Sequence, residues 1–223
     1  GSNAETFIQK VKDNSKDAGT ESMDKRFADG DRDPQFLLEY LNALGATYKQ
    51  SQCNVVAEAL LDGKAETFAS DATLSNVFMK HLQNPYHPSF IYTAKNPQAL
   101  TTTVGNAAVN AKLQSIWNNY PRTLIEEENG TANMDMEKFQ AFVQLMEECN
   151  VPQREQIRLT ALINYAEKKR DWNLYVTHLQ EYWNNKDLDI NDLDLCKFST
   201  PVIKDCQDKK LRNDIKTMLQ KRL

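Results

Sequence analysis

Glycine and proline are scarce in this sequence, with 7 of each among 223 residues. An all-β protein turns often and draws heavily on both residues, so the low counts disfavour that class. Long apolar runs are missing as well, because no stretch approaches the roughly 20 residues that cross a bilayer as a helix. The sequence therefore predicts a mainly helical protein without a membrane span.

Long runs of Lys or Arg are also missing. The 31 acidic residues outnumber the 27 basic ones and give a net charge of −4. Proteins that bind nucleic acids concentrate positive charge against the phosphates, so nucleic acid is not an expected partner. Hydrophobic residues make up 40% of the chain, which is enough to build a globular core.

The motifs of common cofactor and metal sites do not occur in the sequence. It has no C-x-x-C, no H-x-x-x-H and no glycine-rich phosphate loop. His81 and His87 flank Asn84-Pro85-Tyr86, and His178 lies far away in the chain. We interpret the histidines as packed or surface residues, and we predict no cofactor, no metal and no catalytic residue.

The acidic clusters have structural interpretations. Asp29, Asp31 and Asp33 resemble the opening of a calcium loop, but that loop needs Gly at its sixth position and Glu at its twelfth. Pro34 and Tyr40 occupy those positions, so we interpret these acids as helix caps and turn residues. The glutamates at 126–128 and 147–148 are adjacent in sequence, so they point in different directions on a helix and form no facing acid–base pair.

The four cysteines leave one question open. Cys196 and Cys206 are ten residues apart, a spacing that allows them to meet across a helix hairpin. Free, partly buried thiols are the interpretation we favour, since spacing alone does not fix disulfide geometry.

Apolar residues recur at helical spacing along most of the chain. Asp33-Pro34 is typical of a helix start, with a capping side chain before a proline at the first helical position. The apolar stripe that follows and the next one, at residues 53–61, are joined by a short link, which predicts an antiparallel hairpin. Further starts are predicted at Asp71, Pro88, Asn96-Pro97, Asp135 and Pro152. Arg170-Asp171 is predicted as a tight turn before a facing helix from Trp172.

Three further segments carry specific predictions. The helix at residues 107–120 is expected to continue past Pro121, with a kink, toward Glu128, and residues 129–131 are expected to form a loop. A last helix pair is expected at 189–200 and 209–219, with Pro201 between its members. No segment alternates clearly enough to predict a strand.

The helix pairs span about 30–40 residues each, the scale of helical solenoids. Residues 165–172 (YAEKKRDW) resemble the turn of a tetratricopeptide unit, and residues 41–48 (LNALGATY) resemble part of a first helix. The predicted fold is therefore all-α, with stacked helix hairpins forming a tetratricopeptide-like right-handed superhelix.

A wider resemblance covers most of the chain. Residues 23–41 (MDKRFADGDRDPQFLLEYL) are similar to the start of a helical extension in Bacteroidetes-type thioredoxin-like proteins, where it follows the redox domain. Residues 168–176 and the region at 209–211 resemble later parts of that extension. The W-C-x-x-C motif of the family is absent here, so no redox cysteine is carried over.

The resemblance implies a domain organisation and a location. Residues 1–4 look like the remnant of a cleaved expression tag, residues 5–18 would be the last helix of a thioredoxin-like domain plus a linker, and residues 19–223 would be the helical-repeat domain. The parent protein would be a thiol–disulfide oxidoreductase of the periplasm or cell envelope.

The aromatic residues supply candidate protein contacts. Trp172 and Trp183 are expected in the core, because large aromatic residues are mostly buried. Tyr86, in a proline-rich turn, and Tyr175 and Tyr182 are the candidates for contact with a protein partner.

The expected function is non-catalytic protein interaction or scaffolding accessory to the thioredoxin-like protein, with that domain and its clients as partners. The alternatives are a structural dimerisation or spacer element without a separate ligand, and a cryptic all-α enzyme with a pocket of titratable groups.

Overall fold

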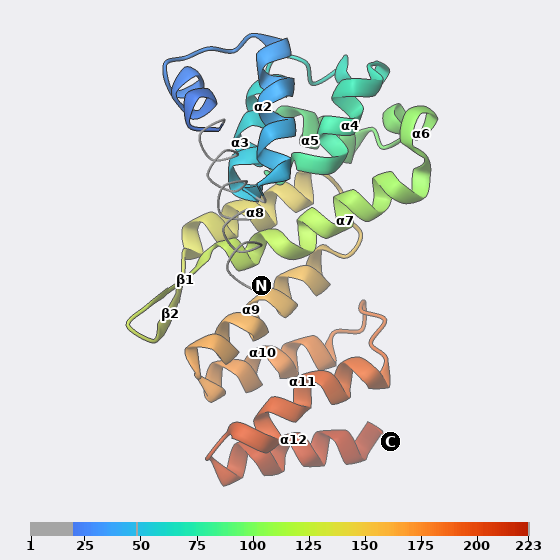
Figure 1. Ribbon diagram of the computed structural model, residues 1–223. Helices are drawn as coiled ribbons and strands as arrows, with labels where there is room; N and C mark the ends of the chain where they lie inside the picture. The colour runs from blue at the N-terminus through green and yellow to red at the C-terminus, as the bar shows by residue number, and fades with distance from the viewer. Residues whose placement is uncertain (1–19, 48, 223) are drawn as a thin grey trace, which may run out of the picture. The chain divides into compact units, whose positions relative to one another are not determined.

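The computed structural model describes residues 20–47 and 49–222. These residues are mainly helical, with one small two-stranded sheet (Figure 1). The predicted all-α class is therefore confirmed. The predicted tag remnant at 1–4 and the helix and linker at 5–18 lie outside the described residues.

The chain divides into two compact units, residues 1–116 and 117–223. Each unit has helices enough for its own core. The prediction of a single repeat domain over residues 19–223 stays a prediction, because a stacked array contains separable parts even when it is one domain.

In the first unit, residues 20–28 are helical. The elements that follow are α2 (Pro34–Ala46), α3 (Gln50–Leu61), the 3-10 turn η1 (Phe68–Ser70), α4 (Ala72–His81), α5 (Pro88–Lys95), α6 (Gln98–Val104) and the first part of α7 (Asn106–Thr123).

Helices α2 and α3 form the predicted hairpin. They pack side by side, and each contributes a stripe of buried side chains, with Leu37, Tyr40 and Leu44 on α2 and Val56 and Leu60 on α3. Burial of these apolar side chains is the main stabilising contribution, on the order of 1.5–3 kcal/mol for each large one.

The second unit contains β1 (Ile125–Glu128), β2 (Thr131–Met134), α8 (Met136–Glu148), α9 (Arg154–Lys169), α10 (Trp172–Asn184), α11 (Asp192–Asp205) and α12 (Lys209–Arg222). Helices α9 and α10 pack closely against each other, and α10 also contacts α11 and α12. One apolar cluster joins these four helices around Leu159, Tyr175, Leu179, Phe198 and Ile215.

Short polar side chains begin several of these helices. The carboxylates of Asp33, Asp71, Asp135 and Asp171 accept hydrogen bonds from backbone N–H groups of the first helical turn. Each bond satisfies a donor that has no partner within the helix. The helix starts predicted at Asp33, Asp71 and Asp135 are confirmed, and Asp171, predicted in a tight turn, caps the helix that follows.

The region predicted as helix and loop around Asn129 forms a β-hairpin instead. Helix α7 passes through Pro121 but ends at Thr123, and β1 pairs antiparallel with β2. Asn129 and Gly130 both have positive φ angles, 51° and 75°, which the tight two-residue hairpin turn requires. The Asn129-Gly130 pair is typical of such a hairpin turn. The strand before it was not predicted, because the three successive glutamates of β1 do not alternate with apolar residues.

A second correction concerns Pro201, which was expected to separate two helices. It lies inside α11, which continues to Asp205. A proline inside a helix removes one backbone donor and costs about 3 kcal/mol or more. Burial of Phe198 and Val202 on the same helix offsets that cost here.

Candidate functional site

The three tyrosines predicted as protein contacts have different environments. Tyr86 is 37% exposed, whereas Tyr175 and Tyr182 are only 0% and 1% exposed. The expectation that the last two rings are accessible is wrong. Both rings are on the face of α10 that packs into the apolar cluster of α9, α10, α11 and α12. They are core residues.

Tyr86 is held on a well-anchored turn. The turn is tied to α3 by the Glu58 carboxylate, which accepts a hydrogen bond from the Asn84 amide at 3.2 Å, and by Asn54, whose side chain accepts from the Gln83 backbone. The buried His87 imidazole contacts the Glu58 carbonyl through Nε2 at 3.2 Å. The ring of Tyr86 is therefore presented by a turn with few degrees of freedom.

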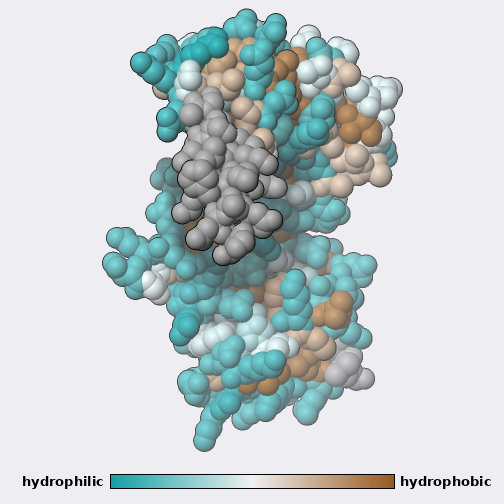
Figure 2. Space-filling model, in the orientation of Figure 1, coloured by the Kyte–Doolittle hydropathy of each residue, from teal (hydrophilic) through white to brown (hydrophobic). Residues whose placement is uncertain are grey.

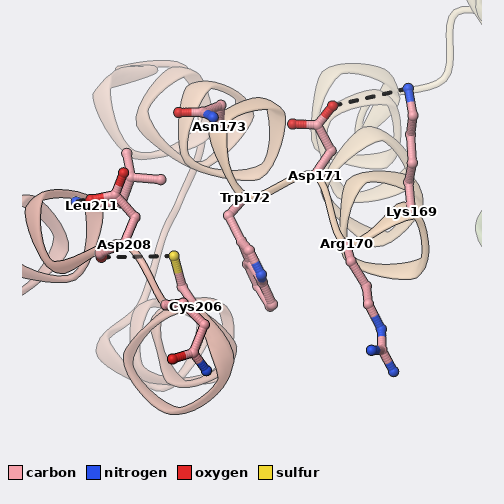
Figure 3. Close-up of a pocket in the computed structure, with 9 residues that line it drawn as sticks. Lys169, Arg170, Asp171, Trp172, Asn173, Cys206, Asp208 and Leu211 are labelled. Atoms are coloured by element: carbon pink, nitrogen blue, oxygen red, sulfur yellow. Dashed lines mark hydrogen bonds and ion pairs between the residues drawn. The ribbon is translucent and has the colours of Figure 1, made fainter.

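A surface groove lies in the second unit, at the turns of two neighbouring hairpins. A groove of about 470 Å³ is bounded by the α9–α10 turn, with Arg170 and Trp172, and by the α11–α12 turn, with Cys206 and Leu211 (Figure 3). We call it the Trp172 groove. Trp172 was predicted in the core, but its side chain is only half-buried.

Backbone hydrogen bonds and a helix cap hold the α9–α10 turn, which forms one wall of the groove. Arg170 ends α9 in the left-handed conformation, with φ of 57°, and its N–H bonds to the Ala166 and Glu167 carbonyls. Asp171 then caps α10 by accepting from the Leu174 N–H at 3.1 Å. Figure 3 shows Arg170 and Trp172 extending in the same direction from this turn, whereas Lys169 points away, toward Asp171.

The opposite wall is built in a similar way. The Asp208 carboxylate accepts from the Lys210 and Leu211 N–H groups, at 2.7 and 3.3 Å. The Cys206 thiol contacts the Asp208 carbonyl at 3.8 Å. All four cysteines are free, which confirms the interpretation of unpaired thiols.

The charged side chains at the groove differ in whether they have a partner. The Asp171 and Asp208 carboxylates cap their helices, and Lys169 lies 3.9 Å from Asp171. Within the part of the chain that the structure describes, Arg170 has no ion-pair partner. A guanidinium in a fixed turn beside an aromatic ring suits a carboxylate next to an apolar side chain.

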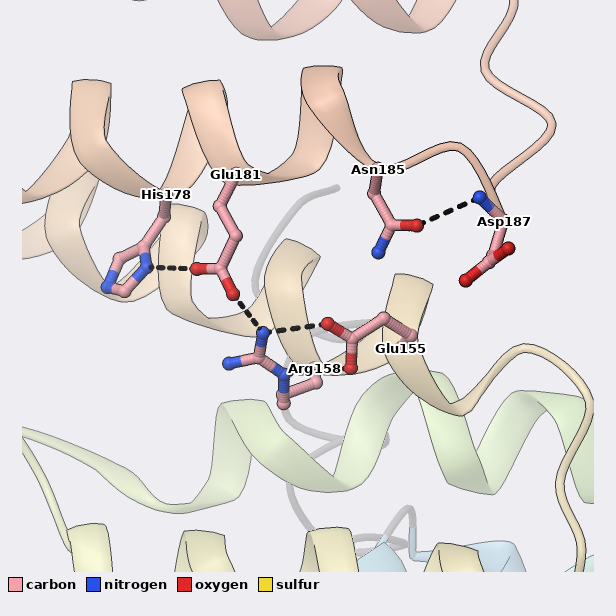
Figure 4. A network of polar contacts seen from close by, with 6 residues as sticks. All are labelled: Glu155, Arg158, His178, Glu181, Asn185 and Asp187. Carbon is pink, nitrogen blue, oxygen red and sulfur yellow. Dashed lines mark hydrogen bonds and ion pairs between the residues drawn. The ribbon is translucent and has the colours of Figure 1, made fainter.

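A separate polar network joins α9 to α10 (Figure 4). Arg158 donates to both oxygens of Glu155, at 2.7 and 2.9 Å, and also to Glu181, which contacts His178 Nδ1 at 3.5 Å. The hydrogen bonds that Glu155 accepts from Arg158 lower the pKa of Glu155. The hydrogen bonds that Arg158 donates to Glu155 and Glu181 raise the pKa of Arg158. Because both carboxylates are bound to one cation, the network is suited to holding two helices together rather than to moving protons.

Within residues 20–47 and 49–222, no group of three or more His, Cys, Asp or Glu side chains is arranged to hold a metal ion. Over these ranges, no helix has both the length and the apolar character needed to cross a bilayer.

Comparisons with known proteins add no family. No protein-family model, no curated protein and no solved structure matches this chain. Nothing in these comparisons links the chain to a thioredoxin-like parent, so that resemblance stays a prediction.

Proposed function

We propose that this chain is a non-catalytic protein-binding domain, in which stacked helix hairpins of the tetratricopeptide type, wound as a right-handed superhelix, present the Trp172 groove to a partner. The observation that carries the proposal is that the half-buried Trp172 and Arg170 lie on the same α9–α10 turn. Arg170 has no ion-pair partner among the described residues. Aromatic and arginine side chains contribute most strongly to protein interfaces.

The chemistry of the groove suggests what the partner carries. Arg170 would bind a carboxylate, and the faces of Trp172 and Leu211 would bury an adjacent apolar side chain. The partner segment would therefore alternate acidic and apolar residues. Most of the face visible in Figure 2 is hydrophilic, with apolar surface in scattered areas, so recognition would be local.

The proposed context is the one implied by the sequence resemblance. The partner would be a thioredoxin-like domain of the same protein, or its clients, in the periplasm or cell envelope. The first test of this context is the native reading frame upstream of Glu5, where a W-C-x-x-C motif is expected.

The binding proposal is tested separately from the context. An acetylated peptide that alternates Asp and Leu is titrated into the full 223-residue chain by calorimetry, beside a peptide with Lys in place of Asp. We expect the acidic peptide to bind and Arg170→Gln to weaken it about tenfold, the loss of roughly one charge-assisted hydrogen bond.

The matched control is Lys186→Gln, which removes one exposed cation from a loop of the same unit that does not line the groove. This variant should bind the acidic peptide as the unmodified chain does. Equal binding of the acidic and basic peptides, or an equal loss in both variants, would contradict recognition at Arg170.

A further inference from the structure

A second cavity lies in the first unit, between α2 and α4, with a volume of about 210 Å³. Its apolar part is formed by Leu38 and Leu41 of α2 and Val77 of α4. Leu41 and Val77 are buried and Leu38 is half-buried. An apolar floor of this size accommodates a short aliphatic chain.

The rim of this cavity is polar. Asn42, Thr73, Asn76 and Lys80 line it and are exposed. Among the described residues, the side chains of Asn42, Asn76 and Lys80 make no hydrogen bond or ion pair. Two amides, a hydroxyl and an ammonium group thus surround the apolar floor at the solvent-facing rim.

The charge around the cavity has a single sign. No Asp or Glu lines it. His81 also lines the cavity, and its Nδ1 is buried without a hydrogen-bond partner. Burial lowers the pKa of His81, and the positive charges of Lys80 and Lys112 lower it further. Burial also lowers the pKa of Lys112 to about 8.

We propose that the cavity between α2 and α4 binds a carboxylate group carried on a short apolar chain. Lys80 would supply the charge, and the amides of Asn42 and Asn76 would donate to the carboxylate oxygens. Leu38, Leu41 and Val77 would cover the aliphatic part. This site lies in a different unit from the Trp172 groove and does not depend on the function proposed for that groove.

The test uses pentanoate as the probe and pentanamide as its uncharged isostere. Each is titrated into the ¹⁵N-labelled full chain, and the side-chain amide signals of Asn42 and Asn76 are followed by NMR. Pentanoate should shift both signals in a saturable way, and pentanamide should not. Lys80→Gln should raise the dissociation constant about tenfold, since bonds to charged groups contribute about 1.5–3 kcal/mol.

Lys95→Gln is the matched control, because Lys95 is an exposed lysine in the last turn of α5 and does not line the cavity. It should leave pentanoate binding unchanged. Lys80 is itself exposed, so its substitution should not disturb folding, which circular dichroism verifies. Asn76→Leu, which removes one donor amide, should weaken binding independently.

The same measurement distinguishes the two sources of such a carboxylate. Acetyl-Gly-Val carries a peptide C-terminus, and acetyl-Gly-Val-amide lacks its charge. Tighter binding of the peptide acid than of pentanoate assigns the site to a chain terminus, and the reverse order assigns it to a free small acid. Equal shifts with pentanamide, unchanged binding in Lys80→Gln, or no shift with any acid overturns the proposal.

Discussion

The hydroxyl of Tyr175 donates a hydrogen bond to the backbone carbonyl oxygen of Phe198, across 2.8 Å. Tyr175 is on α10 and Phe198 is on α11, so the bond connects two successive hairpins of the second unit. Burial raises the pKa of the Tyr175 phenol, so the hydroxyl remains protonated and able to donate.

Tyr175→Phe should lower the free energy of unfolding by about 1 kcal/mol, the net contribution of one buried hydrogen bond. Urea denaturation monitored by circular dichroism measures the change. Tyr165→Phe is the comparison, because Tyr165 is also buried but its hydroxyl has no hydrogen bond within the described part of the chain. A loss of similar size in both variants would argue against a contribution from the Phe198 carbonyl.

Arg170→Gly should stabilise the second unit while weakening peptide binding. Arg170 has a φ of 57°, a conformation that costs a non-glycine residue on the order of 1 kcal/mol and that glycine adopts freely. Part of this gain is offset because glycine also loosens the unfolded chain. A higher thermal midpoint together with lost binding of the Asp–Leu peptide would show that Arg170 contributes to binding at a cost to stability.

Lys186→Gly provides no equivalent gain, because Lys186 is not among the residues with positive φ. If Arg170→Gly kept full peptide affinity, the guanidinium would not be a binding group of the Trp172 groove.

Gly130→Ala should destabilise the β-hairpin by about 1 kcal/mol. A Cβ at this position would meet no atom within 4 Å, so the cost comes from the positive φ of 75° and not from a clash. Hydrogen exchange of the β1 and β2 amides should quicken, while the amides of α10 should be unaffected. Gly45→Ala, in open space within α2, should instead stabilise its helix slightly.

The stability of the first unit should fall as the pH falls below about 6.5, the ordinary pKa of histidine. Burial lowers the pKa of His87 in the folded chain. The unfolded chain then binds a proton before the folded one does, so stability is complete above the unfolded pKa and is lost as the pH falls toward the folded value. Protonation at Nδ1 would also abolish the acceptor for the Ser89 N–H, 3.2 Å away.

Urea denaturation at a series of pH values between 5 and 7.5 tests this prediction. His87→Asn keeps a capping acceptor and removes the titration, so its stability should vary less with pH than that of the unmodified chain. Because the pKa of His81 is also lowered, His81→Gln is examined in parallel. Identical pH dependence in the unmodified chain and in both variants would exclude the histidines as its cause.

Thiol labelling should separate the cysteines by burial. Cys196 is exposed, and Cys53, Cys149 and Cys206 are buried. Burial also raises the pKa of Cys53, which further reduces its reactive thiolate. Native protein should release about one equivalent of thionitrobenzoate rapidly from Ellman's reagent, and Cys196→Ser should remove that phase. Rapid labelling of several thiols would contradict this placement.

The sequence by itself determined the helical class and where several helices begin. Hydrophobic spacing and capping residues act within one or two turns, so the helix starts at Asp33, Asp71 and Asp135 could be predicted from the sequence. The hairpin at Asn129-Gly130 was equally local and was missed because β1 carries three glutamates.

Only the tertiary structure decided which side chains are accessible and which meet. Tyr175 and Tyr182 occupy a core that depends on four helices, and Pro201 lies inside α11 because packing of the surrounding face outweighs the lost backbone bond. The Trp172 groove joins residues 169–173 to 206–211, and the α2–α4 cavity joins Asn42 to Lys80. Such groupings depend on how helices pack over long separations in sequence, which local periodicity does not specify.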